Sequence, residues 1–198
     1  WLAFTACAMP VLLGFVLPAA LLLNLAWGEP VSGTRLRALV GNSFTLAGIA
    51  AVLGVALATA MAYAARLARG PGSGTVALAN RAASLGYAIP GAVIAVGVLV
   101  PLGRLDNWIA GALEEGFGAK PGLLLTGTIV ALVYAYLVRF LAVALQTVEA
   151  GLAKITPRME DVARSLGSSA AGTLVRVHVP LLAGSLATAA LLVFVDVL

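Results

Sequence analysis

Hydrophobic residues fill five stretches of the chain that carry no charged side chain. These stretches are residues 1–28, 38–65, 82–103, 121–138 and 177–195, and each is at least 18 residues long. An α-helix rises 1.5 Å per residue, so about 20 apolar residues cross the ~30 Å hydrocarbon core of a bilayer. Backbone amides find no partner in lipid, and the stretches lack the alternation of barrel strands. The pattern predicts an all-α, polytopic helical membrane protein with five transmembrane helices.

The composition agrees with a membrane protein and excludes several other classes. Hydrophobic residues make up 62% of the chain and charged residues 10%, whereas a soluble domain is about 45–50% apolar and about 25% charged. One cysteine, Cys7, and one histidine, His178, cannot build a disulfide or a cysteine metal cluster. The excess of 12 basic over 8 acidic residues is too sparse for a nucleic-acid partner. No nucleophile and base pair lies at membrane depth, which argues against an enzyme.

The charges between the apolar stretches indicate which loops face the cytoplasm. With the chain start on the cytoplasmic side, loops 66–81 and 139–176 hold eight basic residues and the opposite loops hold four. Cytoplasmic loops of membrane proteins are enriched in Lys and Arg. We therefore expect loop 139–176 to be cytoplasmic. The chain begins with Trp1 and stops inside an apolar run, so we expect it to be part of a longer membrane protein.

Residues 101–120 have apolar side chains at helical spacing with acidic residues off that stripe. Such a segment predicts a short helix lying on the outer membrane surface. Its role is either a plain interfacial cap or a docking surface for an external partner. The apolar stripe consists of Leu105, Trp108, Ile109, Ala112, Leu113 and Phe117.

The longest polar stretch, residues 149–180, is patterned as two short helices. Thr156 and Pro157 start the first, because a hydroxyl caps a helix and proline is tolerated at its first position. Gly167 is expected to end this helix, because the residue that follows a helix is often in the left-handed conformation, which glycine adopts readily. Ser168 or Ser169 then caps a second helix that leads to the last span.

The first of these helices is amphipathic. Glu160 and Arg164, four residues apart, can form an ion pair on its polar side, which also carries Asp161. Two turns are too few for a stable isolated helix, so it must pack against something. The residue pattern leaves open whether this is a cytoplasmic partner or the chain's own membrane domain. The apolar face consists of Met159, Val162, Ala163 and Leu166.

This loop resembles the cytoplasmic EAA loop of ABC transporter permeases. That family has Glu-Ala-Ala, three residues, Gly, nine residues and Ile-x-Leu-Pro. Here Asp161-Val162-Ala163 is followed at the same spacing by Gly167 and by Val177-His178-Val179-Pro180. The exchanges keep the acidic or apolar character of each position.

Other segments are similar to the same family, and several to its iron(III)-type subfamily, so that the resemblance covers residues 38–198. It implies a type I ABC permease core, incomplete at the C-terminus, with the coupling loop at 149–180 and a leading transmembrane helix and external loop at 1–37. It also implies the C-terminal half of a permease. The segments are Asn42-Ser43-Phe44-Thr45-Leu46, Ala62-Tyr63, Tyr87-Ala88-Ile89-Pro90-Gly91-Ala92, Ala135-Tyr136-Leu137-Val138-Arg139-Phe140-Leu141 and Val193-Phe194-Val195-Asp196-Val197.

The resemblance implies a transport subunit of a bacterial inner membrane importer. Its partners would be a cytoplasmic ATPase dimer, a periplasmic solute-binding protein, a second permease half and membrane lipid. ATP would be bound by the partner, and this chain would hold no cofactor and no metal of its own. The ATPase-coupling residues would be Met159, Glu160, Asp161, Val162, Ala163, Arg164, Leu166, Gly167 and Pro180.

The solute follows from the resemblance alone, which indicates iron(III). Related permeases carry sulfate, polyamines, thiamine or phosphonates, and a secondary transporter is the less favoured alternative. Polar residues inside transmembrane spans usually face a cavity or a partner. Asp196, Asn42 and Ser43 are therefore candidates for the solute pathway, although Asn42 and Ser43 also suit helix packing and Asp196 an interfacial position.

Overall fold

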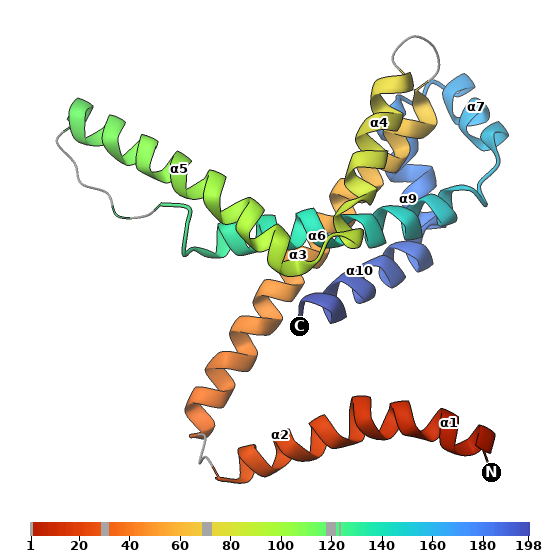
Figure 1. Cartoon of the computed structure of the whole chain (residues 1–198). Helices are drawn as coiled ribbons and strands as arrows, with labels where there is room; N and C mark the ends of the chain where they lie inside the picture. The colour runs from red at the N-terminus through yellow and green to blue at the C-terminus, as the bar shows by residue number, and fades with distance from the viewer. Residues whose placement is uncertain (1, 29–31, 69–72, 118–121, 123) are drawn as a thin grey trace. The chain divides into compact units, whose positions relative to one another are not determined.

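The computed structural model describes residues 2–28, 32–68, 73–117, 122 and 124–198 (Figure 1). These residues form helices and no strands, and they divide into two compact units, Trp1–Asn42 and Ser43–Leu198. Four helices are long and apolar enough to cross a membrane, or five if one bent pair counts as a single span. The predicted all-helical fold is thus confirmed for the described residues, and the long apolar helices are consistent with a multi-pass membrane protein.

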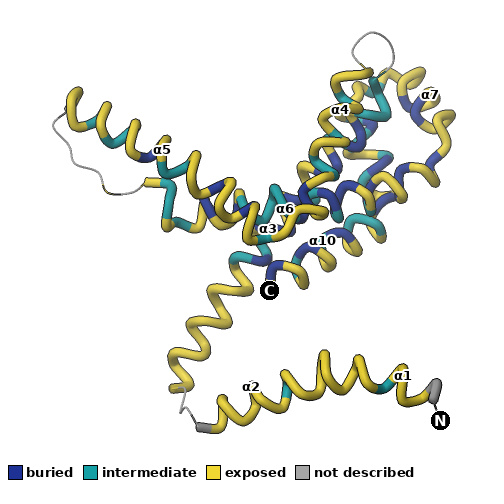
Figure 2. Tube along the Cα trace, viewed as in Figure 1, coloured by how far each residue is buried: buried dark blue, intermediate teal, exposed yellow. Residues whose placement is uncertain are grey.

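The first unit contains the first candidate span, Phe4–Trp27. It is built from α1 (Leu2–Val11), the π-helical turn η1 (Leu12–Val16) and α2 (Leu17–Gly28). Pro10 lies inside α1 and contributes no backbone N–H. Nearly all of its described side chains are exposed (Figure 2). A helix that is apolar all round is typical of a membrane span.

The core of the second unit is formed by α3 (Gly33–Leu67), α6 (Ile129–Leu152) and α10 (Ala183–Val197). The buried face of α3 is lined by small residues, among them Ala47, Ala50 and Ala58. These pack with larger residues of the other two helices, such as Leu145 and Val193. Small residues allow helix backbones to approach closely, which is how helices associate in lipid.

The predicted span 82–103 is wrong in its first part, because the chain breaks there. The helix α4 (Ser73–Ser84) is followed by the 3-10 turn η2 (Gly86–Ala88), and α5 starts at Gly91 and runs to Phe117. The turn packs tightly on α6, since a Cβ on Gly86 would overlap the carbonyl oxygen of Val138. Pro90 precedes the new helix, and its carbonyl accepts the N–H groups of Val93 and Ile94.

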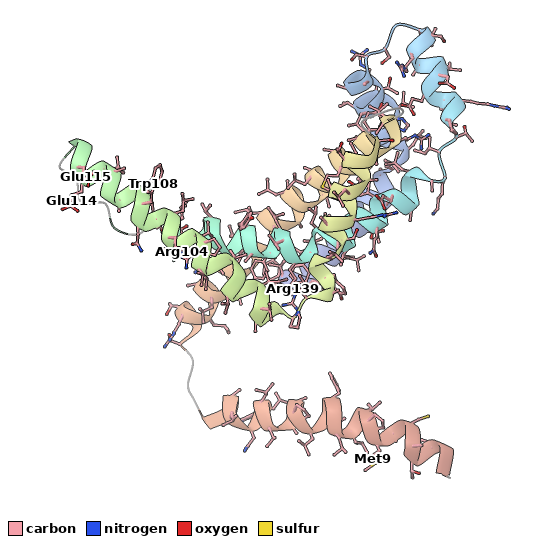
Figure 3. All side chains as sticks on the ribbon, turned by 45° about the horizontal axis from the view of Figure 1, so that its top comes forward. Met9, Arg104, Trp108, Glu114, Glu115 and Arg139 are labelled. Carbon is pink, nitrogen blue, oxygen red and sulfur yellow. The ribbon has the colours of Figure 1, made fainter. Side chains whose placement is uncertain are left out.

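The prediction of a separate surface helix at 101–120 is also wrong. The helix α5 continues through Pro101 to Phe117, and Trp108 lies along it (Figure 3). Asp106, expected on the polar side, is buried instead. Its carboxylate accepts the backbone N–H groups of Leu124, Leu125 and Thr126 and the hydroxyl of Thr126. Asp106 therefore fixes residues 124–126 ahead of α6, a contact that the local sequence pattern does not indicate.

The predicted span 121–138 is displaced toward the C-terminus, because α6 covers Ile129–Leu152. Arg139 consequently lies inside this candidate span rather than in a cytoplasmic loop. Arg66 likewise lies inside the candidate span Gly33–Leu67 and Arg104 inside Gly91–Gly116, so the predicted count of eight basic residues against four does not refer to loop residues alone. Arg69 and Lys120, which are part of that comparison, lie outside the described residues. The sidedness of the loops remains a prediction.

The chain after α6 forms α7 (Pro157–Ser165), α8 (Ala170–Thr173), the π-turn η3 (Leu174–His178) and α9 (Val179–Leu181) before α10. The predicted last span at 177–195 is not straight, because Ala170–Leu181 and Ala183–Val197 meet at an angle of 79°. Leu182 lies at the bend with φ −90° and ψ 0°. Pro180, two residues earlier, cannot donate a helical hydrogen bond.

Candidate functional site: the 149–180 loop and its anchor

The helix α7 presents two different faces. Glu160 and Ala163 point toward the rest of the chain and are 4% and 9% exposed. Met159, Val162 and Leu166 are 47%, 58% and 82% exposed. Of the four residues expected on one apolar face, Ala163 is thus turned inward, and the other three form a stripe that the described chain leaves open.

Both ends of α7 lie where the sequence predicts them, with one difference in capping. Pro157 occupies the first turn, but the hydroxyl of Thr156 makes no capping hydrogen bond. At the other end Gly167 is left-handed, with φ +83°. Its N–H bonds to the carbonyl of Arg164, and the N–H of Ser168 bonds to that of Ala163. This pair of bonds is a Schellman motif, which closes a helix and turns the chain sharply.

The second predicted helix is also present. The Oγ of Ser169 accepts the N–H of Gly172 at 3.1 Å and caps α8, which confirms one of the two residues proposed for this role. The helical segment then continues through η3 to Pro180 in α9.

Arg66, in the last turn of α3, anchors α7 to the helical bundle. Its Nε lies 3.1 Å from Oε2 of Glu160 in a salt bridge that is largely buried. Its two other nitrogens donate to the carbonyls of Leu152 (2.7 Å) and Ile155 (2.8 Å) at the end of α6. The last carbonyls of a helix lack partners within the helix, and a cation there also suits the helix dipole. One guanidinium therefore joins α3, α6 and α7.

This arrangement contradicts the predicted pair between Glu160 and Arg164. Within the described residues Glu160 pairs with Arg66, and Arg164 is exposed together with Asp161. A buried carboxylate needs a close cation because its desolvation is costly, and Arg66 meets that need from another helix. The i, i+4 spacing predicts ion pairs within one helix only, so it does not indicate a partner 94 residues away.

Tyr63, one turn before Arg66 on α3, holds the second half of the loop. Its hydroxyl donates to the carbonyl of Ala170 at 3.0 Å, and its ring lies 5.2 Å from that of His178. His178 is fully buried, and neither of its ring nitrogens has a hydrogen-bond partner among the described residues. The hydroxyl of Thr173 is in the same situation. Tyr63 and Arg66 together fix both halves of the 149–180 loop.

Sequence reasoning did not assign a role to Tyr63 or Arg66. In the sequence Arg66 stands out as a basic residue of a predicted cytoplasmic loop, and Tyr63 as a polar residue within a span and part of a family segment. The available signal was their spacing of three residues, which places both side chains on one face at the end of an apolar helix. That signal shows a shared face but not what the face contacts.

The structure does not gather the three pathway candidates into one site. Asn42 and Ser43 are exposed on α3, and Asp196 is exposed near the end of α10. Phe44 contacts Phe194 edge to face, with ring centroids 5.4 Å apart, which brings Ser43 and Asp196 to the same end of the α3–α10 pair. No hydrogen bond or ion pair joins Ser43 and Asp196 within the described part of the chain.

Comparison with protein-family models finds no match for this chain, and comparison with curated proteins finds no similar sequence. The family therefore rests on the motif spacing in the sequence and is carried below as a proposal.

Proposed function

We propose that this chain is a membrane-spanning permease subunit of an ATP-driven ABC importer, coupled to a cytoplasmic ATPase through α7. The observation that carries the proposal is the division of α7 into an anchored face and an open apolar face. Glu160 and Ala163 lie against the bundle, while Met159, Val162 and Leu166 are exposed. A helix that transmits force needs both a rigid attachment and a free contact surface.

The attachment is suited to passing a displacement into the membrane helices. Arg66 binds Glu160 and the end of α6 at once, so a push on α7 reaches two long helices through one side chain. The Schellman turn at Gly167 and the Tyr63–Ala170 hydrogen bond stiffen the exit toward α10. The spacing from Asp161 to Pro180 matches the EAA loop and supports the same role.

The remaining parts of the proposal follow the family resemblance. A periplasmic binding protein would deliver the solute, a second permease half would complete the pathway, and the 149–180 loop would face the bacterial cytoplasm. The iron(III)-type segments favour iron as the cargo, with sulfate, polyamine, thiamine or phosphonate as alternatives. The alternative class of protein is a secondary transporter. Solute uptake that persists in cells lacking every ATPase subunit would favour that class.

Co-purification from membranes tests the proposal. We expect Val162→Glu or Leu166→Glu to remove the ATPase from the purified complex, because each places a charge in the apolar contact. Ser165→Glu is the matched control, since Ser165 is exposed on the same helix outside the apolar stripe. An ATPase that co-purifies equally with all three variants, or with none including the parent protein, would contradict the proposal.

A further inference from the structure

One cavity of the second unit is lined mainly by polar side chains. It is an open groove of about 700 Å³ along the seam between α6 and α10. Two cavities beside α5, in contrast, are lined almost entirely by apolar residues. The polar residues of the groove are Gln146, Thr147, Lys154, Ser185 and Thr188.

The groove lies on helices that could cross a membrane. One face of α6 and of the residues directly after it carries Gln146, Ala150 and Lys154, which are four residues apart. Gly184 and Thr188 share one face of α10 in the same way. Polar side chains within a span are costly in lipid and normally face a water-filled cavity or a partner. The seam is therefore a hydrated track rather than a lipid-facing surface.

The charge along this track is positive. Lys154 is the one charged residue that lines the groove. Arg139 lies seven residues before Gln146 on α6 (Figure 3), but its guanidinium packs against Gly91 at the start of α5 and does not line the groove. Within the described residues neither cation forms an ion pair. Glu149 is turned toward α4, where its Oε1 accepts a hydrogen bond from Asn80 at 3.1 Å.

The hydrogen-bonding groups of the groove favour an acceptor-rich solute. Thr147 and Thr188 donate to the carbonyls of Val143 and Gly184 one turn earlier in their own helices. The donors that remain for a solute are the ammonium of Lys154, the amide of Gln146 and the hydroxyl of Ser185. Rings of Arg and Lys are the usual lining of pores for anions and phosphate.

We propose that the α6–α10 groove is part of the solute path and that the solute crosses it as a small anion rich in oxygen acceptors. An inorganic oxyanion and a metal ion enclosed in an anionic chelate share this chemistry. This inference rests on the proposed transport function and narrows its cargo. It disfavours polyamines, thiamine and a bare iron(III) cation, whose positive charge Lys154 would repel.

Thiol labelling in permeabilised membranes tests the charge of the groove. Cys7 is the chain's one cysteine, so Cys7→Ser gives a cysteine-free background into which Gln146→Cys is introduced. A cleft lined by one sign of charge raises the local concentration of counter-ions by about tenfold or more. We expect an anionic methanethiosulfonate to modify the new cysteine about tenfold faster than a cationic one, after correction for their intrinsic reactivity.

Two further variants separate charge from structure. Lys154→Gln is expected to bring the two rates close together, while Lys154→Arg keeps the preference. Equal rates in the parent, faster modification by the cationic reagent, or no modification by either reagent would overturn the inference. The ATPase co-purification described above is run on the same variants. An intact ATPase complex with no anion preference would remove this inference alone, whereas absence of the ATPase would remove the transport proposal.

Protection by solutes identifies the source of the anion. Sulfate, phosphate, ferric citrate and spermidine are each added during labelling, with sodium chloride at equal ionic strength as the control. Protection by sulfate or phosphate indicates an oxyanion, and protection by ferric citrate indicates a chelate. Protection by spermidine alone would contradict an anionic path.

Discussion

The Nε atom of Arg66 lies 3.1 Å from Oε2 of Glu160, although the two residues are 94 positions apart in the chain. Both side chains are largely buried, and the same guanidinium also caps the end of α6 through the carbonyls of Leu152 and Ile155. Arg66 is thus the point where the helix proposed to receive force meets two helices of the bundle. Its planar guanidinium uses three separate nitrogen atoms to reach the three acceptors, whereas the donors of an ammonium group all radiate from one nitrogen.

Removing either partner of this pair is expected to loosen α7. Arg66→Gln leaves the carboxylate of Glu160 buried without a cation, which costs about 3–5 kcal/mol of folding free energy. The stability of Arg66→Lys should lie between that of the parent protein and that of Arg66→Gln, because lysine keeps the positive charge but lacks the planar guanidinium. Thermal unfolding and protease cleavage within 153–169 measure the effect, with Arg81→Gln on the exposed side of α4 as the control. An Arg66→Gln protein as stable as the control would show that the contact is dispensable.

Substitutions at Gly167 should act through backbone conformation alone. Its φ is +83°, and a Cβ at this position would meet nothing within 4 Å. A left-handed conformation costs an ordinary residue about 1–2 kcal/mol, and Asn tolerates it better. We therefore expect ATPase association to weaken in the order Asn, Ala, Val, while the amount of protein in the membrane stays constant. An equal loss with Asn and Val would point to a steric role instead.

Gly151 allows α6 and α10 to pack closely where the 149–180 loop begins. A Cβ there would lie 2.5 Å from Oγ and 2.7 Å from Cβ of Ser185, so Gly151→Ala must push the helices apart. Overpacking of this kind costs about 1–3 kcal/mol. Adding Ser185→Gly should restore most of the lost thermal stability. Gly48→Ala is the matched control, because nothing lies within 4 Å of that position and it should be neutral or stabilising. Failure of the double variant to recover would contradict this packing.

Replacing His178 by leucine should not destabilise the protein. The imidazole is fully buried, and neither nitrogen has a hydrogen-bond partner in the part of the chain described. Burying an unpaired polar group costs about 1–3 kcal/mol, and a leucine of similar size avoids that cost. We expect an unchanged or higher melting temperature for His178→Leu. Tyr63→Phe, which loses the bond to Ala170, should be destabilised by about 0.5–1.5 kcal/mol. A lower melting temperature for His178→Leu than for Tyr63→Phe would refute this assignment.

Local patterns predicted the helices of this chain well and their boundaries less well. The charge-free stretches identified the long apolar helices, and the Thr156–Gly167 pattern identified α7 and its left-handed end. The charge pattern places Arg139 at the start of the cytoplasmic loop 139–176, yet it lies inside α6 beside Phe140, with its guanidinium carbon 5.2 Å from the ring centroid. A charge count cannot distinguish a loop cation from one that is accommodated within a helix.

The contacts that organise the site join distant parts of the chain. Helical spacing predicts Glu160 on the polar side of α7, and its partner becomes visible only where the end of α3 packs against that helix. The same holds for Asp106, whose carboxylate binds backbone groups 18 to 20 residues away. Pairings of this kind depend on the packing of long helices, for which a single sequence carries no local signal.

The central claim is that the open stripe of α7 contacts a cytoplasmic ATPase. A photoreactive amino acid at Leu166 tests it most directly in intact cells, with Ala163, which is buried on the same helix, as the control position. We expect a crosslink from position 166 to a nucleotide-binding protein and none from position 163. Crosslinks from position 166 only to this chain, or labelling of that position from outside the cell, would contradict it.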